Sequence, residues 1–198
     1  MTGIIHRRWI WLKRFRKRRG YGVHSPFAFN FLTYVVYEKG AYYAYKDLKH
    51  RYFCPAYLWN GHNVKCRKFL FRLANFVHPH VIELHGEMDD ASLAYLTAGS
   101  SKSVLIRPAD VTQVADDKDR LLVIGGDVTS DKWHALLKRI TTERSVCMVT
   151  GIHSSKERLN AWKHLCLSEK VYVSFDLYDY GILFFDSSKQ KQHYIVNF

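Results

Sequence analysis

The stretch VIELHG, residues 81–86, decides the fold class of this sequence. It is a short apolar run that ends at a glycine, and similar uninterrupted runs follow at 104–106, 121–124 and 146–149. Short, partly β-branched runs of this kind are typical of strands covered on both faces, because a strand with one solvated face alternates apolar and polar residues instead. The sequence therefore predicts a set of buried strands that begins at Val81.

Segments with helical spacing lie between these strands, at 91–98, 131–141 and 155–167. A strand, a helix and a second strand in succession form a right-handed crossover that leaves the two strands parallel. We therefore expect an α/β fold with a mostly parallel sheet.

The end of the chain has a different pattern. The apolar runs 171–175 and 182–185 are joined by DLYDYG, which is too short to hold a helical crossover. Strands connected by so few residues pair in the antiparallel sense. We expect a C-terminal antiparallel hairpin, followed by a last strand or extended end at 194–196.

The first third of the chain has helical patterns. Ser25 and Pro26 offer an N-cap followed by proline at the first helical position, and the helix is expected to stop at 39–40. A further helical stretch covers 64–77, with apolar side chains on one side and basic ones on another.

Length and composition fit one compact unit. The 198 residues are 47% hydrophobic and 15% aromatic, which is enough apolar material for a single core. We expect residues 1–78 to form a basic helical extension and residues 79–198 an α/β domain, and the two to pack together as one unit.

Positive charge is concentrated at the front of the chain. Residues 1–72 carry 16 Lys and Arg against 2 Asp and Glu, whereas residues 73–198 carry 14 against 16. The densest run is HRRWIWLKRFRKRR, residues 6–19, in which aromatic side chains interrupt the basic ones. The candidate polyanion-binding residues are its eight basic side chains: Arg7, Arg8, Lys13, Arg14, Arg16, Lys17, Arg18 and Arg19.

Three interpretations of this run stay open. As a helix, it places Ile5, Trp9 and Leu12 on one narrow apolar stripe that could dock on the rest of the protein and leave the charges in solvent. The run could instead bind nucleic acid, with phosphates held by Arg and Lys and bases stacked on aromatic rings. It could also lie on an anionic membrane surface. Charge alone does not separate the last two, since both partners are polyanions.

Composition argues against several classes of protein. No run approaches 18 uncharged apolar residues, so no membrane span is expected, and the apolar run at the basic N-terminus is too short for a signal peptide. Cys54, Cys66, Cys147 and Cys166 fit no zinc-ligand spacing and are expected to be reduced thiols. We expect a soluble, cytoplasmic protein.

Several motifs resemble one bacterial family. They are YGVHSPFAF at 21–29, YYAY at 42–45, KFLFRLANFVHPHVIEL at 68–84, FDLYDYGILFF at 175–185 and KQHYIVNF at 191–198. Together with a parallel sheet that ends in a hairpin, they make the chain similar to the Rossmann-like class I S-adenosylmethionine-dependent methyltransferases that carry a basic, aromatic N-terminal extension. The resemblance covers most of the chain. It implies S-adenosylmethionine as cofactor, over the carboxyl ends of the first strands.

The cofactor turn departs from the pattern of that family, in which the first strand leads into E-L-G-x-x-x-G. The acidic residue is kept as Glu83, but His85 and Asp89 stand at the glycine positions and Gly86 comes one position late. The resemblance therefore implies Glu83, His85 and Gly86 as a degenerate cofactor-binding motif. The acidic residues within 87–90 would stabilise the start of the next helix and repel the carboxylate of the cofactor.

Other family positions are altered as well. Arg107 stands where an acid would bind the ribose hydroxyls, and arginine accepts no hydrogen bond. The 14 residues 107–120 are too few for the usual helix, strand and helix, so the sheet is expected to lack one edge strand. Asp127 is the one displaced acid at strand ends where metal-dependent relatives carry carboxylates, so no metal site is expected. His153 is a candidate general base at the end of a strand.

These departures predict a methyltransferase-like protein with weak or no transferase activity. One alternative is an active methyltransferase of unknown substrate, in which His153 or Asp127 acts on the substrate. Another is a non-catalytic module that binds nucleic acid or an anionic membrane surface through residues 6–19. S-adenosylmethionine is the expected cofactor if the protein is active, and no cofactor is expected otherwise.

Overall fold

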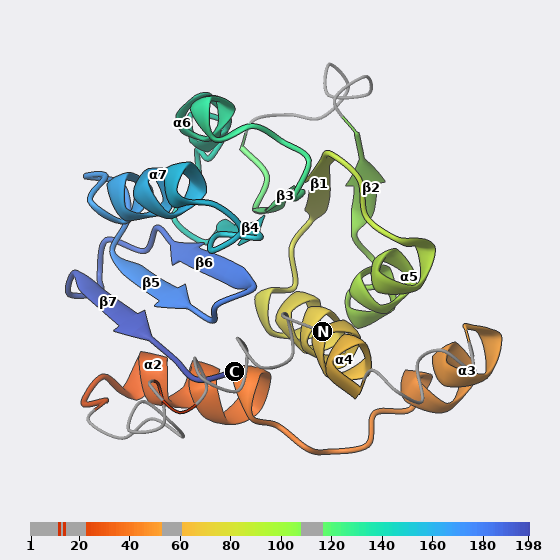
Figure 1. Cartoon of the computed structure of the whole chain (residues 1–198). Helices are drawn as coiled ribbons and strands as arrows, with labels where there is room; N and C mark the ends of the chain where they lie inside the picture. Colours follow the sequence, from red (N-terminus) through yellow and green to blue (C-terminus); the bar gives the residue numbers. More distant parts are fainter. Residues whose placement is uncertain (1–11, 13, 15–22, 53–60, 108–116) are drawn as a thin grey trace.

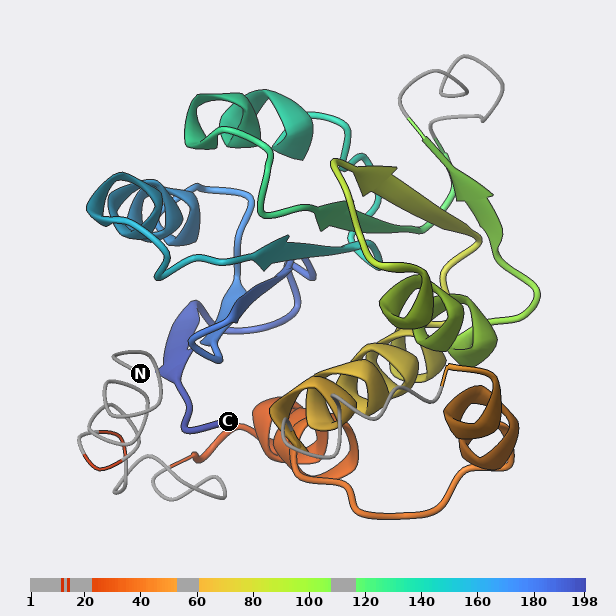
Figure 2. The same cartoon turned by 45° about the vertical axis from the view of Figure 1, so that its right-hand side comes forward.

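The computed structural model of the chain describes residues 12, 14, 23–52, 61–107 and 117–198. In this part of the chain a seven-stranded sheet lies between two layers of helices (Figures 1 and 2). The strands are β1 (Val81–His85), β2 (Val104–Ile106), β3 (Arg120–Ile124), β4 (Val146–Thr150), β5 (Val173–Asp176), β6 (Tyr180–Phe184) and β7 (Gln192–Ile195). Their order across the sheet is β2-β1-β3-β4-β6-β5-β7.

The predicted α/β class and the mostly parallel sheet are confirmed. β1 pairs in parallel with β2 and with β3, and β3 pairs in parallel with β4. The predicted C-terminal hairpin is confirmed too, because β5 and β6 are antiparallel. β6 inserts between β4 and β5 and runs opposite to both, and β7 pairs in parallel with β5. The sequence did not indicate this insertion, which depends on contacts between strands far apart in the chain.

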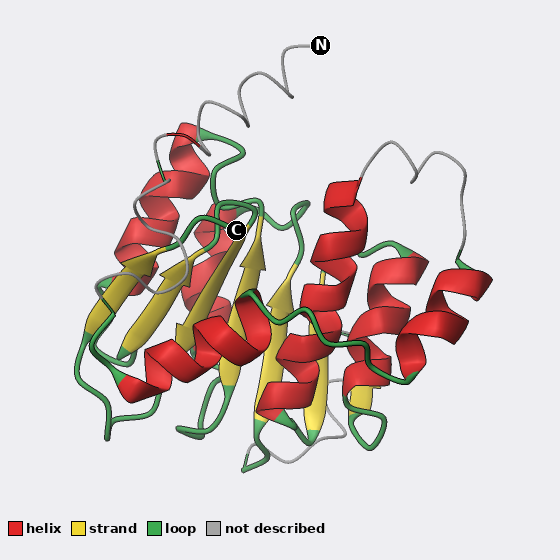
Figure 3. Ribbon diagram, turned by 90° about the horizontal axis from the view of Figure 1, so that it is seen from below, coloured by secondary structure: helices red, strands yellow, loops and turns green. Residues whose placement is uncertain are grey.

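Helices cover both faces of the sheet, and Figure 3 shows one layer of them crossing in front of the strands. The layer on this side contains α2 (Pro26–Phe31), the π-helical turn η2 (Leu32–Val36), α3 (Ala44–Arg51), α4 (Gly61–Val77) and α5 (Asp90–Gly99). The opposite layer contains the 3₁₀ turn η5 (Ser130–Lys132), α6 (Trp133–Leu137) and α7 (Lys156–Cys166).

Each face of the sheet has its own core, because successive residues of a strand point to opposite sides. Leu84 of β1 and Val123 of β3 belong to the core under α2 and α4. Leu122 and Ile124 of β3 belong to the core under α6 and α7. The first core joins the N-terminal helices to the sheet: the ring of Phe31 in α2 lies 4.5 Å from that of Phe175 in β5, measured between centroids.

The helix that begins after Ser25 starts as predicted but ends early. Ser25 caps α2 with its hydroxyl group. The helix was expected to run to 39–40, yet its last turn widens to a π-helix that ends at Val36. The side chain of Arg72 in α4 donates to the carbonyl oxygens of Val35 at 2.6 Å and of Val36 at 3.4 Å. A buried arginine therefore satisfies carbonyl groups that a further helical turn would have used.

The helix predicted over 131–141 is also shorter than expected. α6 ends at Leu137, and beyond it the backbone N–H of Arg139 bonds to the carbonyl oxygen of Leu136 at 3.0 Å. Bonds over three residues instead of four form a tighter 3₁₀ turn, which keeps roughly helical spacing in the sequence. This turn carries the side chain of Arg139 to Glu83 of β1.

Candidate functional site at the carboxyl edge of the sheet

The carboxyl ends of β1, β3, β4 and β5 lie at one edge of the sheet, because these strands run in the same direction. β2 lies on one side of β1 and β3 on the other, so the order of strands reverses between β1 and β3. In open α/β sheets, ligands bind in the crevice at such a point. Four of the catalytic and cofactor candidates from the sequence stand at strand ends or turns at this edge, namely His85, Gly86, Asp127 and His153, whereas Glu83 lies in the middle of β1.

The side chain of Asp127 bridges the turns that follow β1 and β3. Its Oδ1 accepts a hydrogen bond of 2.9 Å from the backbone N–H of Glu87, in the turn after β1. Nearby, the N–H of Gly125 donates to the carbonyl oxygen of His85 at 2.7 Å. Gly86 adopts φ +86°, and a Cβ built there would stand only 2.3 Å from Asp127 Oδ1. The carboxylate thus occupies space that a side chain at position 86 would fill, and it ties the two turns together.

Glu83 is fully buried and belongs to an ion cluster. Arg120 Nη1 lies 2.9 Å from Oε2, His85 Nε2 lies 2.7 Å from Oε1, and Arg139 Nε also donates to Oε1. Burial raises the pKa of Glu83, but the hydrogen bonds and charges of His85 and Arg139 outweigh it and leave this pKa below its ordinary value. Both oxygens of the ionised carboxylate are therefore engaged by the protein itself.

The two arginines of this cluster were missed in the sequence. Leu122 is the register partner of Glu83, so Arg120, two residues earlier on β3, faces the same side of the sheet. An arginine at the head of an apolar run was the only signal that could have found it. Arg139 is 56 positions from Glu83, and no pattern in the sequence couples the two.

Asp89 caps α5, as expected for the acidic start of this helix. Its Oδ1 accepts from the N–H of Ser92 at 3.1 Å and lies 2.9 Å from Arg67 Nη2 of α4. Burial raises the pKa of Asp89, while the hydrogen bonds to Ser92 and the charge and hydrogen bond of Arg67 lower it to below its ordinary value. An ionised carboxylate that is paired with Arg67 thus caps the start of α5.

His153 follows β4 and meets Asp176 at the end of β5. Nε2 of His153 lies 2.7 Å from Asp176 Oδ2, and Arg14 Nη1 lies 2.9 Å from Asp176 Oδ1. The His153 ring stacks on the ring of Tyr178, with 4.9 Å between centroids and 23° between planes. We call these four residues the His153 cluster: Arg14, His153, Asp176 and Tyr178.

Asp176 orients the imidazole of His153. When Nε2–H donates to Asp176, the neutral ring carries its lone pair on Nδ1, which can then accept a proton. Nη2 of Arg14 stands 3.1 Å from Nε2 of His153, because both nitrogens contact Oδ2 of Asp176. Burial raises the pKa of Asp176, but the hydrogen bonds and charges of His153 and Arg14 hold it below its ordinary value. An oriented imidazole beside an ionised carboxylate is suited to proton transfer.

The backbone of Tyr178 is in the left-handed region, with φ +75°. This conformation is rare for a large side chain and costs about 1–3 kcal/mol, so it persists only where neighbouring contacts hold it. The N–H of Leu177 donates to the carbonyl oxygen of Tyr180 at 2.8 Å, and the N–H of Gly151 to that of Asp179 at 2.6 Å. Backbone strain that neighbouring hydrogen bonds maintain is common in turns that carry functional side chains.

Arg158 of α7 fixes the two loops that carry Asp127 and His153. Its guanidinium donates to the carbonyl oxygens of Val128 and Thr150, each at 2.7 Å, and to that of Gly151 at 3.0 Å. The loops after β3 and β4 are therefore held in one arrangement. Arg158 was not among the candidate residues from the sequence.

Arg14 is the one candidate polyanion-binding residue that the structure describes, and its guanidinium is engaged with Asp176 and with the carbonyl oxygen of Val196 at 3.3 Å. Leu12, expected on the docking stripe, is 63% exposed. The remainder of the stripe and the other seven candidates lie outside the described residues: Arg7, Arg8, Lys13, Arg16, Lys17, Arg18 and Arg19.

Two general features bear on chemistry. Among the described residues, no three His, Cys, Asp or Glu side chains gather as metal ligands, and no helix is long and apolar enough to cross a membrane.

Cys66, Cys147 and Cys166 are free thiols, and burial raises the pKa of Cys166 to about 11, which disfavours the reactive thiolate.

Compared with known proteins, the chain matches no protein-family model and no curated protein sequence. The function is therefore argued from the geometry of the carboxyl edge.

Proposed function

We propose that this protein has the fold of a class I S-adenosylmethionine-dependent methyltransferase but transfers methyl groups weakly or not at all, because its own side chains occupy the cofactor crevice. One observation carries the proposal: the Asp127 carboxylate accepts a hydrogen bond from Glu87 N–H across the crevice and sits against Gly86. In the family that the chain resembles, glycines leave this space for the cofactor.

The order of the strands supports the family part of the proposal. A parallel sheet whose last hairpin is antiparallel is what the resemblance implies, and β6 is the strand that runs opposite to its neighbours. In the described part of the chain β2 has no outer neighbour, which favours the loss of one edge strand.

The charges at the crevice support the loss of cofactor binding. Glu83, the acidic residue kept from the family motif, is neutralised by Arg120 and Arg139. Asp89 is ionised, caps the start of α5 and pairs with Arg67, so a carboxylate of the protein already occupies this helix start and engages the nearby cation. The charged groups of the motif are therefore already paired within the protein and do not offer a binding site for the methionine part of the cofactor.

Calorimetric titration of the full chain with S-adenosylmethionine and S-adenosylhomocysteine tests the proposal. We expect no binding heat at millimolar ligand. A dissociation constant near micromolar would overturn the proposal that the protein's own side chains block the cofactor site. Two variants separate steric from electrostatic closure. Asp127→Ala removes the side chain, whereas Asp127→Asn removes the charge but keeps an oxygen for Glu87 N–H. If only the alanine variant gains cofactor binding, the volume of the Asp127 side chain prevents binding in the wild type. If both variants gain it, the negative charge prevents binding.

A second candidate is an active methyltransferase, and the His153 cluster favours it. An imidazole oriented by Asp176 and stacked on a strained tyrosine at the carboxyl edge could accept the proton of a substrate hydroxyl or amine. Radiolabelled S-adenosylmethionine incubated with the protein and with fractions of small molecules, RNA and protein tests this. Label transfer that is lost in His153→Gln and kept in His80→Gln, at a 64% exposed histidine, would establish the second candidate.

A further inference from the structure

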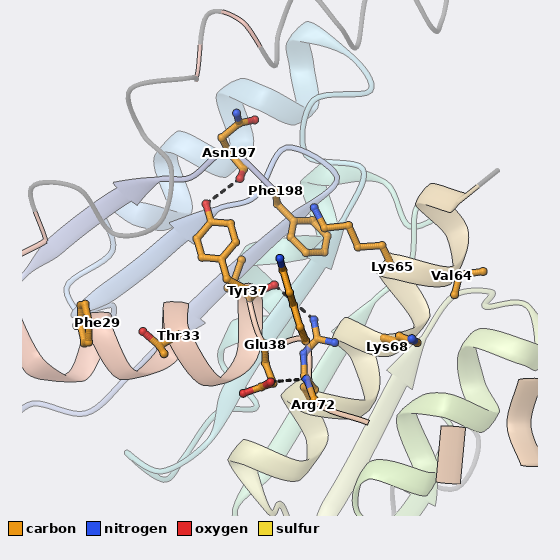
Figure 4. Close-up of a pocket in the computed structure, with 13 residues that line it drawn as sticks. Phe29, Thr33, Tyr37, Glu38, Val64, Lys65, Lys68, Arg72, Asn197 and Phe198 are labelled. Carbon is orange, nitrogen blue, oxygen red and sulfur yellow. Dashed lines mark hydrogen bonds between the residues drawn. The ribbon is translucent and has the colours of Figure 1, made fainter. Parts of the chain in front are cut away.

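A pocket of about 820 Å³ lies on the helical side of the molecule, between η2, the loop that follows it, the amino-terminal half of α4 and residues 197–198 (Figure 4). Volumes of this size are typical of sites for small organic molecules. The rings of Phe29, Tyr37 and Phe198 contribute to its walls. Nothing in the proposed cofactor chemistry uses this pocket.

The charges that line the pocket are mostly positive. Among the described residues the lining contains four cations and one acid: Lys39, Lys65, Lys68, Arg72 and Glu38. The carboxylate of Glu38 accepts from the N–H of Gly40 in its own loop. Lys65 Nζ stands 4.0 Å from the centroid of the Phe198 ring, and Figure 4 shows both on the side of the pocket that faces Tyr37. The walls of the pocket therefore combine positive charge with aromatic surface.

Arg72 distinguishes this pocket from an ordinary basic surface, because its side chain is buried at 4% exposure. The other two buried arginines in the described part of the chain each face an acid: Arg67 lies 2.9 Å from Asp89, and Arg120 lies 2.9 Å from Glu83. Arg72 has no carboxylate within ion-pair distance among the described residues; it donates to the last carbonyl oxygens of η2 and also interacts with the side chain of Tyr45. A buried cation is costly unless an anion accompanies it. A bound anion would supply that partner.

We propose that this pocket binds a small organic phosphate. The planar guanidinium of Arg72, held in place by η2, suits phosphate oxygens, and the nearby lysines add charge for a group that carries more than one negative charge. An apolar or aromatic part of the same molecule would pack on Tyr37 and Phe198, with a cation–π contact already present at Lys65. A soluble nucleotide fits both requirements.

The pocket and the carboxyl-edge crevice lie on different faces of α4. Lys65, Lys68 and Arg72 are three and four residues apart and share one face of the helix. Arg67, which bonds to Asp89 at the crevice, is two residues from Lys65 and so lies about 200° round the helix. Closure of the crevice by Asp127 is therefore compatible with an open phosphate site, and the two proposals stand or fall separately.

Calorimetric titration of the full chain with ADP tests the proposal, with inorganic phosphate as the probe for charge alone. We expect ADP to bind with a dissociation constant below millimolar, and inorganic phosphate to bind at least about tenfold more weakly because it lacks a ring. The variant Lys39→Glu/Lys68→Glu should weaken ADP binding by at least about tenfold. These lysines are chosen because Arg72 also supports η2, so that a change at Arg72 would confuse folding with binding.

The matched control is Lys102→Glu, at an exposed residue after α5 that does not line the pocket. It should leave ADP binding unchanged. No heat with millimolar ADP, or the same loss in Lys102→Glu as in the pocket variant, would overturn the proposal. Vesicles of phosphatidylcholine with 30% phosphatidylglycerol distinguish the source of the phosphate. If the protein binds these vesicles through Lys39 and Lys68 but does not bind ADP, the proposal of a soluble ligand is wrong. The pocket would then be assigned to a lipid headgroup.

Discussion

At the scale of single residues, this protein is marked by buried acids that each bond to two basic side chains. Glu83 meets Arg120 and Arg139, and Asp176 meets Arg14 and His153. A buried charge is tolerated when its partners replace the water it has lost. Asp176 and His153 lie at the carboxyl edge of the sheet, whereas Glu83 lies in the middle of β1 and meets Arg120 at the amino end of β3. In both clusters the charge of the acid is satisfied within the protein.

Replacing Glu83 should destabilise the fold strongly. Glu83→Gln would leave the fully buried guanidinium of Arg120 without its counter-charge, which costs about 3–5 kcal/mol. Urea unfolding followed by circular dichroism measures the change. Glu87→Gln, at an exposed position four residues away, is the matched control and should change the free energy of unfolding by less than about 0.5 kcal/mol. A loss below about 1 kcal/mol in Glu83→Gln would show that the cluster contributes little.

The stability contributed by Asp176 should depend on pH. Its folded-state pKa is lowered by His153 and Arg14 against the opposing effect of burial, so the folded state favours the ionised carboxylate. That stability is present above the unfolded pKa of about 3.9 and is lost as the pH falls through the lower folded pKa. The difference in unfolding free energy between the wild type and Asp176→Asn should therefore be smaller at about pH 3 than at about pH 5. An equal difference at both values would contradict the assignment.

At the scale of elements, close approach of helices and loops determines the local geometry. α4 and α5 lie close together at Gly99, where a Cβ would stand 2.1 Å from the backbone carbonyl oxygen of Phe71. Backbone atoms cannot rotate away as a flexible side chain can. The separation of the two helices, and with it the position of Arg67 opposite Asp89, therefore depends on the absence of a side chain at position 99.

Gly99→Ala should push α4 and α5 apart. Alanine has the better helix propensity, but the overlap with Phe71 requires a shift of backbone, so we expect a net loss of about 1–3 kcal/mol in thermal or urea unfolding. Gly126→Ala is the control, because a Cβ there would stand 3.6 Å from Thr150 Oγ1, an ordinary contact. If the two variants were equally stable, the close approach of α4 and α5 would not be a constraint on this fold.

At the scale of the whole molecule, the N-terminal helices and the sheet share one core. Phe31 and Leu32 from the first segment and Phe69 from α4 belong to the same buried cluster as Leu84 and Phe175 of the sheet. The described residues of 1–78 and of 79–198 thus share one core.

The full chain should unfold in a single transition. Near- and far-ultraviolet circular dichroism should give coincident urea curves, because no part of the shared core can be exposed alone. Residues 79–198 expressed by themselves should lack a cooperative transition, since one face of the sheet would be bare. Two separated transitions in the full chain, or cooperative unfolding of 79–198, would contradict a shared core.

The sequence by itself determined the fold class and most of the elements. Uninterrupted, partly β-branched apolar runs such as 121–124 are typical of strands covered on both sides, and the link 176–181 is too short for a helical crossover between parallel strands. The acidic start of α5 and the cap at Ser25 were also predictable, because they depend on bonds within a few residues. Helix ends at Val36 and Leu137 were not, because a distant arginine and a change to 3₁₀ bonding determine them.

Only the tertiary structure decided what the candidate residues do. The sequence marked Glu83, Gly86, Asp127 and His153 as candidate site residues, but it did not show that Asp127 reaches Glu87 or that His153 pairs with Asp176. Those pairs come from strands and loops 20 or more residues apart, and local patterns carry no information about such contacts. The same holds for Arg72, whose burial without a carboxylate partner becomes visible only when α4 is packed against η2. Strand and helix formation depend on short-range periodicity, whereas neutralisation of buried charge depends on which elements the fold brings together.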